Sequence, residues 1–353
     1  MIVKNEAHII KRCLISVKDI VDTWCIVDTG SSDGTQKIIK EVLKDIPGKL
    51  IERPWINFGH NRTEAYEYAK ELGEWALLLD ADMILENKGF IKEQLNNKVD
   101  AYSILQKNGA LAYQNIRLIN LSKEWKCVGV THEYWDQVNQ ATIKSSLSTL
   151  ELIDLGDGGS KSDKFTRDIE LLIGGIQKEP QNLRYKFYLA QSYKDIGDYE
   201  AAIPWYEYCA KNSDWPEESW YSDYMKLKCM IKLKRSIIEI EKQGGNTWLK
   251  RPWRSETLYT LGNYYRELKD WKKAYRVLKA AESIEYPKDD ILFIEYQIYE
   301  GLVLDELAVA AYWNGKTKES IEILDRLLKT QYGKKEMKRL KINREHSLRA
   351  LKH

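Results

Sequence analysis

The sequence has no large excess of charge of either sign. Its 353 residues include 55 Lys and Arg and 53 Asp and Glu, which gives a formal net charge of +2 at pH 7. Nucleic acids and anionic membranes both select for a strongly basic partner surface, so the composition favours neither as an obligatory partner. We therefore expect no nucleic acid among its partners.

Long hydrophobic runs and paired cysteines are also missing. No apolar stretch approaches the roughly 18 residues of a membrane-spanning helix, and residues 1–6 lack the apolar core of a signal peptide. These absences predict a soluble, cytoplasmic protein without a membrane span. The five cysteines are odd in number and widely spaced, which predicts reduced core residues and not a disulfide framework or a zinc cluster: Cys13, Cys25, Cys127, Cys209 and Cys229.

Phenylalanine is scarce, whereas tyrosine and tryptophan are abundant. The chain has 5 Phe against 22 Tyr and 12 Trp, and most of the Tyr follows residue 180. The length also exceeds that of one average domain. We therefore expect two domains, at residues 1–160 and 161–353.

The clearest local signal is a short apolar run that ends in two acids. Residues 76–79 are too few for an average helix, and Asp80 and Asp82 follow them. This pattern predicts a buried parallel strand whose C-terminal end carries carboxylates, at the edge where open α/β sheets bind ligands. Carboxylates at alternate positions suit a divalent cation shared with phosphate oxygens. An isolated Asp-x-Asp pair can equally begin a turn, so other evidence must decide.

Two earlier strands end in the same way. Residues 1–3 lead into Asn5 and Glu6, and a strand at residues 23–28 ends in Asp28, before a loop rich in glycine and serine. Glycine in such a loop lets backbone N–H groups approach a charged ligand, although a plain strand-to-helix connection also uses it. With the helices between them, these strands predict a right-handed, mostly parallel sheet with three acidic strand ends on one edge.

Further strands follow the acid pair. Residues 101–105 and 115–119 flank the turn-prone pair Asn108-Gly109 and predict an antiparallel hairpin. A strand at residues 127–131 then leads into His132-Glu133. A lone histidine is more often structural, but a His-Glu pair after a strand is a candidate site in a domain that already has paired acids.

Four motifs, in this order, resemble those of family 2 glycosyltransferases with the GT-A fold: residues 1–6, residues 27–35, Asp80-Ala81-Asp82 and residues 130–133. The resemblance covers residues 1–165 and implies a nucleotide-diphosphate sugar as the donor, with UDP as the expected nucleotide. It also implies that Arg62 reaches the donor and that Asp80 faces the ribose or the sugar. The nucleotide-sugar-binding residues that it implies are Val3, Asn5, Glu6, Asp28, Asp33, Arg62, Asp80 and Ala81.

The chemistry of sugar transfer assigns roles to the acids. Departure of a nucleoside diphosphate builds negative charge that a metal neutralises, and the acceptor hydroxyl needs a carboxylate within hydrogen-bonding reach. We expect Asp82 to hold Mn²⁺ or Mg²⁺, Glu133 to be the general base and Asp80 to be a second catalytic residue. His132 is a further metal ligand or a diphosphate contact. The resemblance implies an inverting single displacement.

The sequence departs from the family at two places. Relatives usually have residues before the first motif, and those with a helical tail often carry a histidine where Gly156 stands. Asp157 can supply an acid ligand there, with Asp163 close by, or the segment can be a flexible joint. The third metal ligand is therefore His132 or Asp157.

The second half of the chain has helical periodicity and resembles tetratricopeptide (TPR) repeats. Three copies lie at residues 189–206, 258–281 and 304–324, with a degenerate copy expected at 220–241 and an insertion near Tyr286-Pro287. Most of the aromatic residues should pack between helices. Others could form a surface for a glycan or protein acceptor, which we expect at Trp220, Trp248 and Trp253, beside Arg251 and Arg254. Self-association as a homodimer through the repeats is a further expectation.

The combined patterns predict an α/β GT-A domain followed by an all-α repeat domain, and a metal-dependent glycosyltransferase. One alternative is an interaction scaffold with an inactive GT-A domain, against which the intact acids argue. Another is a nucleotidyltransferase, which would be expected to have a glycine-rich basic loop after the first strand, where residues 4–12 contain no glycine.

Overall fold

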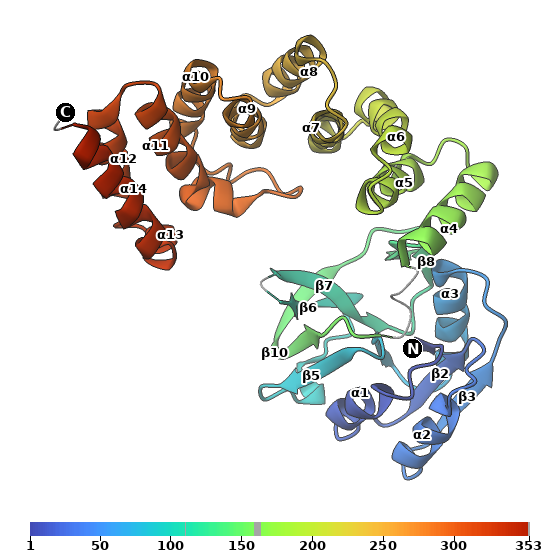
Figure 1. The fold of residues 1–353 in the computed structure, drawn as a ribbon. Helices are drawn as coiled ribbons and strands as arrows, with labels where there is room; N and C mark the ends of the chain where they lie inside the picture. Colours follow the sequence, from blue (N-terminus) through green and yellow to red (C-terminus); the bar gives the residue numbers. More distant parts are fainter. Residues whose placement is uncertain (110, 159–163, 352–353) are drawn as a thin grey trace. The chain divides into compact units, whose positions relative to one another are not determined.

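The computed structural model describes residues 1–109, 111–158 and 164–351. The chain divides into two compact units, Met1–Pro180 and Gln181–His353. All strands of the described residues lie in the first unit, whereas the second is helical (Figure 1). The predicted order, an α/β region followed by an all-α region, is confirmed.

The first sheet is parallel, as the alternation of strands and helices predicts. Its strands lie in the order β1 (Ile2–Val3), β2 (Trp24–Asp28) and β3 (Gly48–Glu52). The helices that connect and follow them are α1 (Ile10–Val17), α2 (Thr35–Val42) and α3 (Phe58–Ala69). The buried side chains of α1 recur at helical spacing, which packs one face of this helix against the rest of the unit; they are Ile10, Cys13, Leu14 and Val17.

The second sheet is mixed. Its spatial order is β4 (Trp75–Leu77), β7 (Leu111–Asn120), β6 (Ala101–Asn108), β10 (Lys144–Asp154) and β5 (Met83–Asn87). The predicted hairpin is confirmed, since β6 and β7 pair antiparallel and Gly109 adopts a positive φ of 56° at the turn.

The strand before the acid pair differs from the prediction. Strand β4 is shorter than the predicted strand at residues 76–79. It pairs antiparallel with β7, the second strand of the hairpin, instead of joining the parallel strands. Strands β5 and β10 were not predicted. The acids therefore follow a strand end, as expected, but in the mixed sheet.

A cavity of about 520 Å³ lies among α1, α3, β2 and β4. Its lining is mostly apolar and includes Leu14, Ala65 and Leu77. Strands β1 and β4 belong to different sheets. The two sheets thus share an apolar interior that contains unfilled volume.

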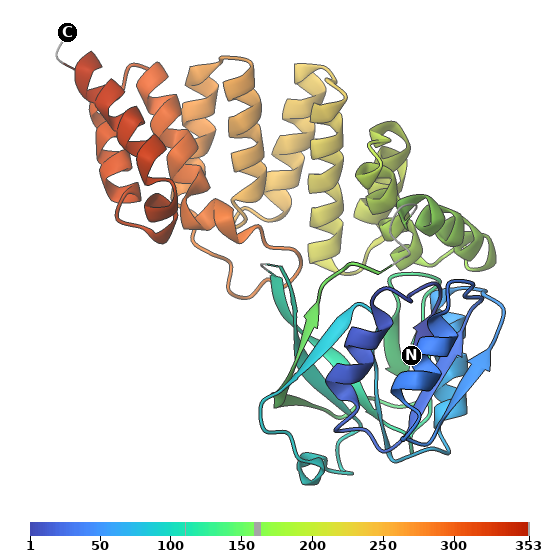
Figure 2. The same ribbon diagram turned by 60° about the horizontal axis from the view of Figure 1, so that its bottom comes forward.

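The second unit is an array of helices that lie side by side (Figure 2). A π-helical turn, Ile298–Leu302, precedes α11. The helices are α5 (Leu183–Asp195), α6 (Tyr199–Asn212), α7 (Pro216–Lys232), α8 (Ile237–Lys250), α9 (Glu256–Glu267), α10 (Trp271–Glu282), α11 (Val303–Trp313), α12 (Thr317–Leu327), α13 (Gln331–Lys335) and α14 (Met337–Ala350).

The turns between paired helices repeat, which confirms the predicted repeats. Gly197, Lys269 and Gly315 each adopt a positive φ shortly before the next helix begins. The degenerate copy corresponds to α7 and α8, and the insertion to the segment between α10 and the π-helical turn.

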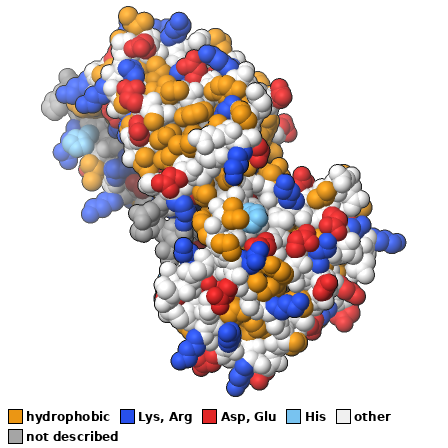
Figure 3. Space-filling view, turned by 90° about the vertical axis from the view of Figure 1, so that its right-hand side faces the viewer, with side chains coloured by type: hydrophobic (Ala, Val, Ile, Leu, Met, Phe, Trp, Pro, Cys, Tyr) orange, Lys and Arg blue, Asp and Glu red, His pale blue; other side chains and the backbone are white. Residues whose placement is uncertain are grey.

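The expected aromatic surface is only partly exposed. Trp220 is fully buried and stacks on Tyr224 at 5.3 Å, and Arg254 is fully buried in ion pairs with Glu256 and Asp290. The prediction that Trp220 and Arg254 face an acceptor is therefore wrong, because both fill the helical core. Other hydrophobic side chains do reach the surface, where Figure 3 shows them gathered over the helices. The most exposed include Ile238, Leu249 and Ile291, and Trp253 is 49% exposed.

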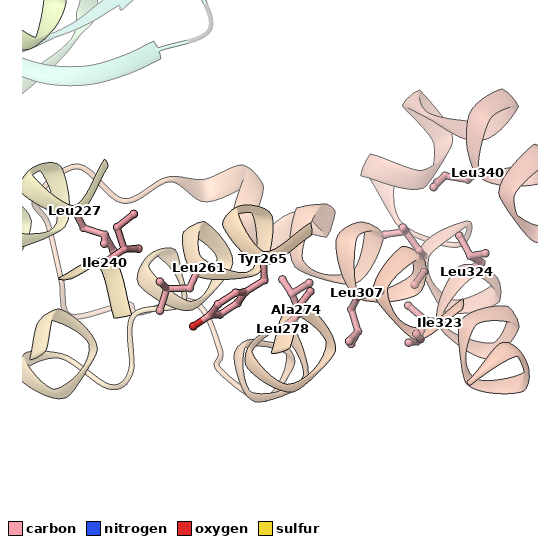
Figure 4. Close-up of a cluster of buried hydrophobic side chains, with 14 of the residues drawn as sticks. Leu227, Ile240, Leu261, Tyr265, Ala274, Leu278, Leu307, Ile323, Leu324 and Leu340 are labelled. Carbon is pink, nitrogen blue, oxygen red and sulfur yellow. The ribbon is translucent and has the colours of Figure 1, made fainter. Parts of the chain in front are cut away.

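Small residues let the repeat helices approach closely. A Cβ atom at Gly262 of α9 would lie 2.5 Å from Cγ of Leu278 on α10, so glycine is required there. Figure 4 shows Leu261, Tyr265, Ala274 and Leu278 in the cluster that fills this interface. The predicted crossing of helices through small residues is confirmed at this pair.

The described residues contain no disulfide and no membrane-spanning helix. All five cysteines are free thiols, which agrees with the prediction of reduced residues. Among the helices described, none has the length and the hydrophobicity to cross a membrane.

Candidate active site

The loops after β1 and β2 are joined by hydrogen bonds. The Asn5 backbone N–H donates to Oγ of Ser31 at 2.9 Å, and the Ser32 N–H donates to Oδ1 of Asn5 at 2.8 Å. The Ala7 N–H donates to Oδ2 of Asp33 at 2.9 Å. Two of the three predicted acidic strand ends are thus held together as one structure.

Asp28 is fully buried and shapes the second of these loops. Its Oδ1 accepts hydrogen bonds from the N–H groups of Gly30 and Ser31, at 2.9 and 2.8 Å. Burial opposes ionisation of Asp28, but the hydrogen bonds from Ser31 and Gly30 outweigh it and lower its pKa. Asp28 therefore acts on the loop backbone, and Gly30 adopts a φ of 106° that favours glycine.

Val3 and Ala81 lie in the core. Both side chains belong to one buried apolar cluster, at 3% and 6% exposure. The backbone carbonyl of Val3 accepts hydrogen bonds from the N–H and the hydroxyl of Thr29. These two predicted site residues support the loops by packing and backbone pairing.

Arg62 joins two of the predicted catalytic acids. Its Nη2 donates to Oδ1 of Asp80 at 2.5 Å, and its Nε donates to Oε1 of Glu133 at 2.8 Å. The three side chains are only 15%, 26% and 17% exposed, respectively. Residues from α3, the turn after β4 and the His-Glu loop, far apart in sequence, therefore meet at one guanidinium.

The start of α3 explains why Arg62 reaches this point. The first N–H groups of a helix lack partners within the helix. Here the N–H groups of Phe58 and Gly59 donate to the carbonyls of Val130 and Gly129, at 3.1 and 3.0 Å. A Cβ atom at Gly59 would lie 2.3 Å from the Gly129 oxygen. The close contact between α3 and the loop thus depends on glycine and fixes Arg62 beside Glu133.

A second arginine also stabilises the ionised form of Asp80. Arg117 Nη1 lies 3.5 Å from Oδ2 of Asp80. Burial raises the pKa of Asp80, but the positive charges of Arg62 and Arg117 outweigh it and lower the pKa from 3.8 to about 2. Asp80 is therefore a carboxylate at neutral pH, with an arginine near each oxygen.

Polar residues behind Arg117 extend this network, and the sequence did not reveal them. Arg117 donates to Oε1 of the buried Gln106 through Nε at 3.1 Å and Nη2 at 2.8 Å. Gln106 in turn donates to Asp154 at 3.1 Å. Gln106 and Arg117 stand on the two strands of the predicted β6–β7 hairpin. Their polar side chains on facing strands were the signal that could have revealed this contact.

Asp82 lies where another segment crosses the site. A Cβ atom at Gly158 would lie 3.3 Å from Oδ2 of Asp82 and 3.6 Å from Oε1 of Glu6. The Leu155 N–H donates to the carbonyl of Asp82 at 3.1 Å. The segment after β10 thus brings the first motif and the acid pair together.

The two candidates for a third metal ligand have different surroundings. Both carboxylate oxygens of Asp157 pair with Arg12, at 2.7 and 3.0 Å, and this raises the pKa of Arg12. His132 Nε2 lies 3.9 Å from Oδ2 of Asp168 on α4 (Lys164–Lys178). Arg12 and Asp168 were missed from the sequence. Asp163 lies outside the described residues.

The acidic side chains of the site fit a metal ion that substrate phosphates also help to bind. Among the described residues, no three His, Cys, Asp or Glu side chains gather closely enough to bind a metal ion. Mg²⁺ is commonly held by one or two carboxylates together with substrate phosphates. Since Asp80 faces two arginines, Asp82 is the carboxylate of the pair that suits such a site.

The N-terminal unit matches a known family. Residues 1–139 match the family model described as glycosyl transferase family 2. The chain is 28% identical over 251 residues to SPbeta prophage-derived glycosyltransferase SunS of Bacillus subtilis, which covers 67% of this chain and 58% of that protein. It is 39% identical over 111 residues to a TPR repeat-containing protein of Synechococcus elongatus, covering 30% of this chain and 26% of that protein.

Other similarities are more limited. An uncharacterized glycosyltransferase of Rickettsia felis is 35% identical over 82 residues, 23% of this chain and 27% of that protein. A crystal structure of MamA has a TM-score of 0.39 and 17% identity, covering 52% of this chain and 98% of that one. The chain thus spans little more than half, or about a quarter, of the curated relatives named here. Residues 1–139 of this chain are thus similar to glycosyl transferase family 2, and the helical repeats follow in the second unit.

Proposed function

We propose that this protein transfers a sugar from a nucleotide-diphosphate sugar, expected to be a UDP-sugar, to a nucleophile on a glycan or protein acceptor. The observation that carries the proposal is the cluster of Asp80, Arg62 and Glu133, with Asp82 two residues after Asp80. The cluster lies within the residues that match the glycosyltransferase family.

In this proposal, the loops and the acids bind different parts of the nucleotide sugar. The joined loops of Asn5, Glu6 and Asp33 would contact the nucleoside through their backbone and side chains, and Asp80 would face the ribose or the sugar. Asp82 would hold Mn²⁺ or Mg²⁺, which neutralises charge on the departing diphosphate when bound. His132 would approach the same diphosphate from the opposite loop.

Glu133 is the proposed general base of an inverting displacement. Arg62 engages Oε1 of Glu133, and Oε2 makes no hydrogen bond within the part of the chain that the structure describes. An oxygen held in place through its neighbour can accept the proton of an acceptor hydroxyl. Arg62 would keep the carboxylate oriented for this step.

The helical unit is the proposed acceptor-binding region. Large hydrophobic side chains such as Leu249 and Ile291 are 69% and 79% exposed there, and Trp253 is half exposed. Exposed apolar groups of this kind bind peptide or sugar-ring surfaces.

A panel of nucleotide sugars with Mn²⁺ tests the proposal through hydrolysis, in which water replaces the acceptor. The wild type should hydrolyse at least one donor. Glu133→Gln should lose at least about 100-fold in rate while still binding the donor, as followed by thermal stabilisation. Glu86→Gln, at an exposed position on β5, is the matched control and should keep the wild-type rate. Hydrolysis of no donor by the wild type would contradict the proposal, and an unchanged rate in Glu133→Gln would remove Glu133 as the base.

A further inference from the structure

Helix α4 supplies a buried acid to the loop that carries His132 and Glu133. Asp168 of this helix is only 1% exposed. It lies after residues 1–139, which match the family model, yet within the compact unit Met1–Pro180. A buried carboxylate needs compensating partners, because its removal from water is costly.

Asp168 contacts two adjacent residues of the His-Glu loop, and Arg167 Nη2 of its own helix lies 3.7 Å from its Oδ1. Thr131 Oγ1 donates to Oδ1 of Asp168 at 3.1 Å. Oδ2 of Asp168 is buried without a hydrogen-bond partner among the described residues, and His132 Nε2 lies 3.9 Å from it. One carboxylate thus anchors the loop through Thr131 and faces the imidazole of His132.

The conformation of this loop needs support from both sides. His132 has a φ of 51°, which is uncommon for a residue other than glycine and persists when surrounding contacts enforce it. On one side, the N–H of Phe58 donates to the carbonyl of Val130. On the other side lies Asp168, and the Arg167 guanidinium also lies 5.2 Å from the centre of the Phe58 ring. Helices α3 and α4 therefore hold the loop between them.

We propose that Asp168 is a positioning residue that fixes the ring orientation of His132 and the loop that presents Glu133; this role in transfer rests on the proposed function. A carboxylate that faces one ring nitrogen favours the proton on that nitrogen and leaves the other nitrogen as an acceptor. Asp168 lies on the Nε2 side of the His132 ring, so it favours the proton on Nε2. The helix that follows the matched domain is then part of its catalytic machinery.

The first test reads the imidazole of His132 and needs no activity. The chain has five histidines, so the ring signals of histidine-labelled protein can be resolved by NMR, with His132→Gln for assignment. Asp168→Asn keeps an acceptor for Thr131 but removes the charge. It should move the His132 signals and leave the other four in place. Asp100→Asn, at another buried acid of the same unit, should move none.

A second variant keeps the inference testable if Asp168→Asn does not fold. Thr131→Val removes only the hydroxyl that bonds to Asp168, and it should shift the His132 signals in a folded protein. If His132 keeps its wild-type signals in either folded variant, the inference is overturned.

The second test separates this inference from the proposed function. With a donor that the wild type hydrolyses, Asp168→Asn should lower kcat by about 10- to 100-fold, as changes behind metal-site histidines do, with little change in KM. Asp168→Glu, which restores the charge, should recover part of the rate. An unchanged kcat would overturn the positioning role. Absence of hydrolysis by the wild type would instead contradict the proposed function, and the NMR result would still decide the contact between Asp168 and His132.

Discussion

Arg62 is the residue on which the candidate site depends most. The resemblance to the family implied that it reaches the donor, and the structure shows it bridging Asp80 and Glu133. Removing one partner of a buried ion pair typically costs about 3–5 kcal/mol, because the remaining charge stays buried. Removing Arg62 would therefore leave Asp80 and Glu133 as buried charges without this partner.

The lowered pKa of Asp80 predicts a specific pH dependence of stability. Asp80 titrates near pH 2 in the folded protein, against an ordinary value of 3.8, so the unfolded chain binds more protons between these values. Its stabilising contribution is complete above about pH 4 and is lost as the pH falls towards 2. The wild type should thus lose about 2 kcal/mol relative to Asp80→Asn over this range, by urea unfolding.

A matched control is Asp19→Asn, at an exposed position of the same unit. It should follow the wild-type profile throughout. Parallel profiles for the wild type and Asp80→Asn would show that the ion pairs with Arg62 and Arg117 do not stabilise the fold.

Sequence patterns identified individual residues better than their partners. Asp80, Arg62 and Glu133 were all predicted as site residues. Asp80 and Glu133 stand in motifs that follow strands, and Arg62 was implied by the resemblance to the family. The pair of Arg12 and Asp157 was not predictable, since 145 positions separate the two residues and only the completed fold brings them together. The same holds for Asp168, whose partners come from another element.

At the scale of elements, the contact between the start of α3 and the loop at residues 129–133 controls the geometry of the site. The loop carbonyls accept the N–H groups at the start of α3. Because Arg62 lies one turn into the same helix, any movement of α3 changes its distance to Glu133.

Gly59→Ala should disturb this contact. Its Cβ would meet the Gly129 and Cys127 backbone oxygens at 2.3 and 2.8 Å, and backbone atoms cannot easily move aside. We expect a loss of about 1–3 kcal/mol in the free energy of unfolding, as for other overpacked positions. Gly73→Ala is the control, since its nearest neighbour would lie at 3.9 Å, and it should change stability little. Equal stabilities for the two variants would contradict the close packing of α3 on the loop.

The apolar cavity predicts the opposite effect at another small residue. Ala65 of α3 lines the cavity, so Ala65→Leu should fill it and raise the free energy of unfolding by about 0.5–2 kcal/mol. Ala101→Leu, fully buried and outside the cavity lining, should instead destabilise the fold by about 1–3 kcal/mol. Denaturant unfolding of both variants compares the two positions, and destabilisation by Ala65→Leu as well would contradict the cavity.

Elements with a strong periodicity of apolar residues were predicted, and those without it were missed. Helix α1 and the β6–β7 hairpin follow from apolar spacing and from Asn108-Gly109. Strand β10 contains several Ser and Thr residues among its apolar positions and gave no clear signal. Strand β5 was also missed; the turn at Asp80, where the Met83 N–H donates to the Asp80 carbonyl, separates it from β4.

At the scale of the whole molecule, the chain is two compact units with different tasks in the proposal. The N-terminal unit includes α4 and extends to Pro180, beyond the domain end at residue 160 that composition and pattern predicted. The spacing of residues could not place this boundary, because α4 has the same helical period as the repeats that follow it.

Truncation distinguishes these two boundaries. A chain that ends after Pro180 should fold and melt cooperatively. One that ends after residue 160 loses the contacts of Asp168 with Thr131 and of Arg167 with Phe58, and its Tm should be lower by several degrees. Each kcal/mol lost lowers Tm by about 2–4 °C in a unit of this size. Circular dichroism melts would show it, and equal Tm values would mean that α4 is not part of the folded unit.

The central claim is that Asp82 and a divalent metal together hold a nucleoside diphosphate. The most direct measurement is the thermal stability of the full chain with UDP, with and without Mn²⁺, for the wild type, Asp82→Ala and the surface control Asp19→Ala. Saturation at about 100 times Kd should stabilise the wild type by about 2.7 kcal/mol, and only when Mn²⁺ is present. We predict the same shift for Asp19→Ala and little or none for Asp82→Ala; an equal shift in Asp82→Ala, or none in the wild type with UDP or any other nucleoside diphosphate, would contradict the claim.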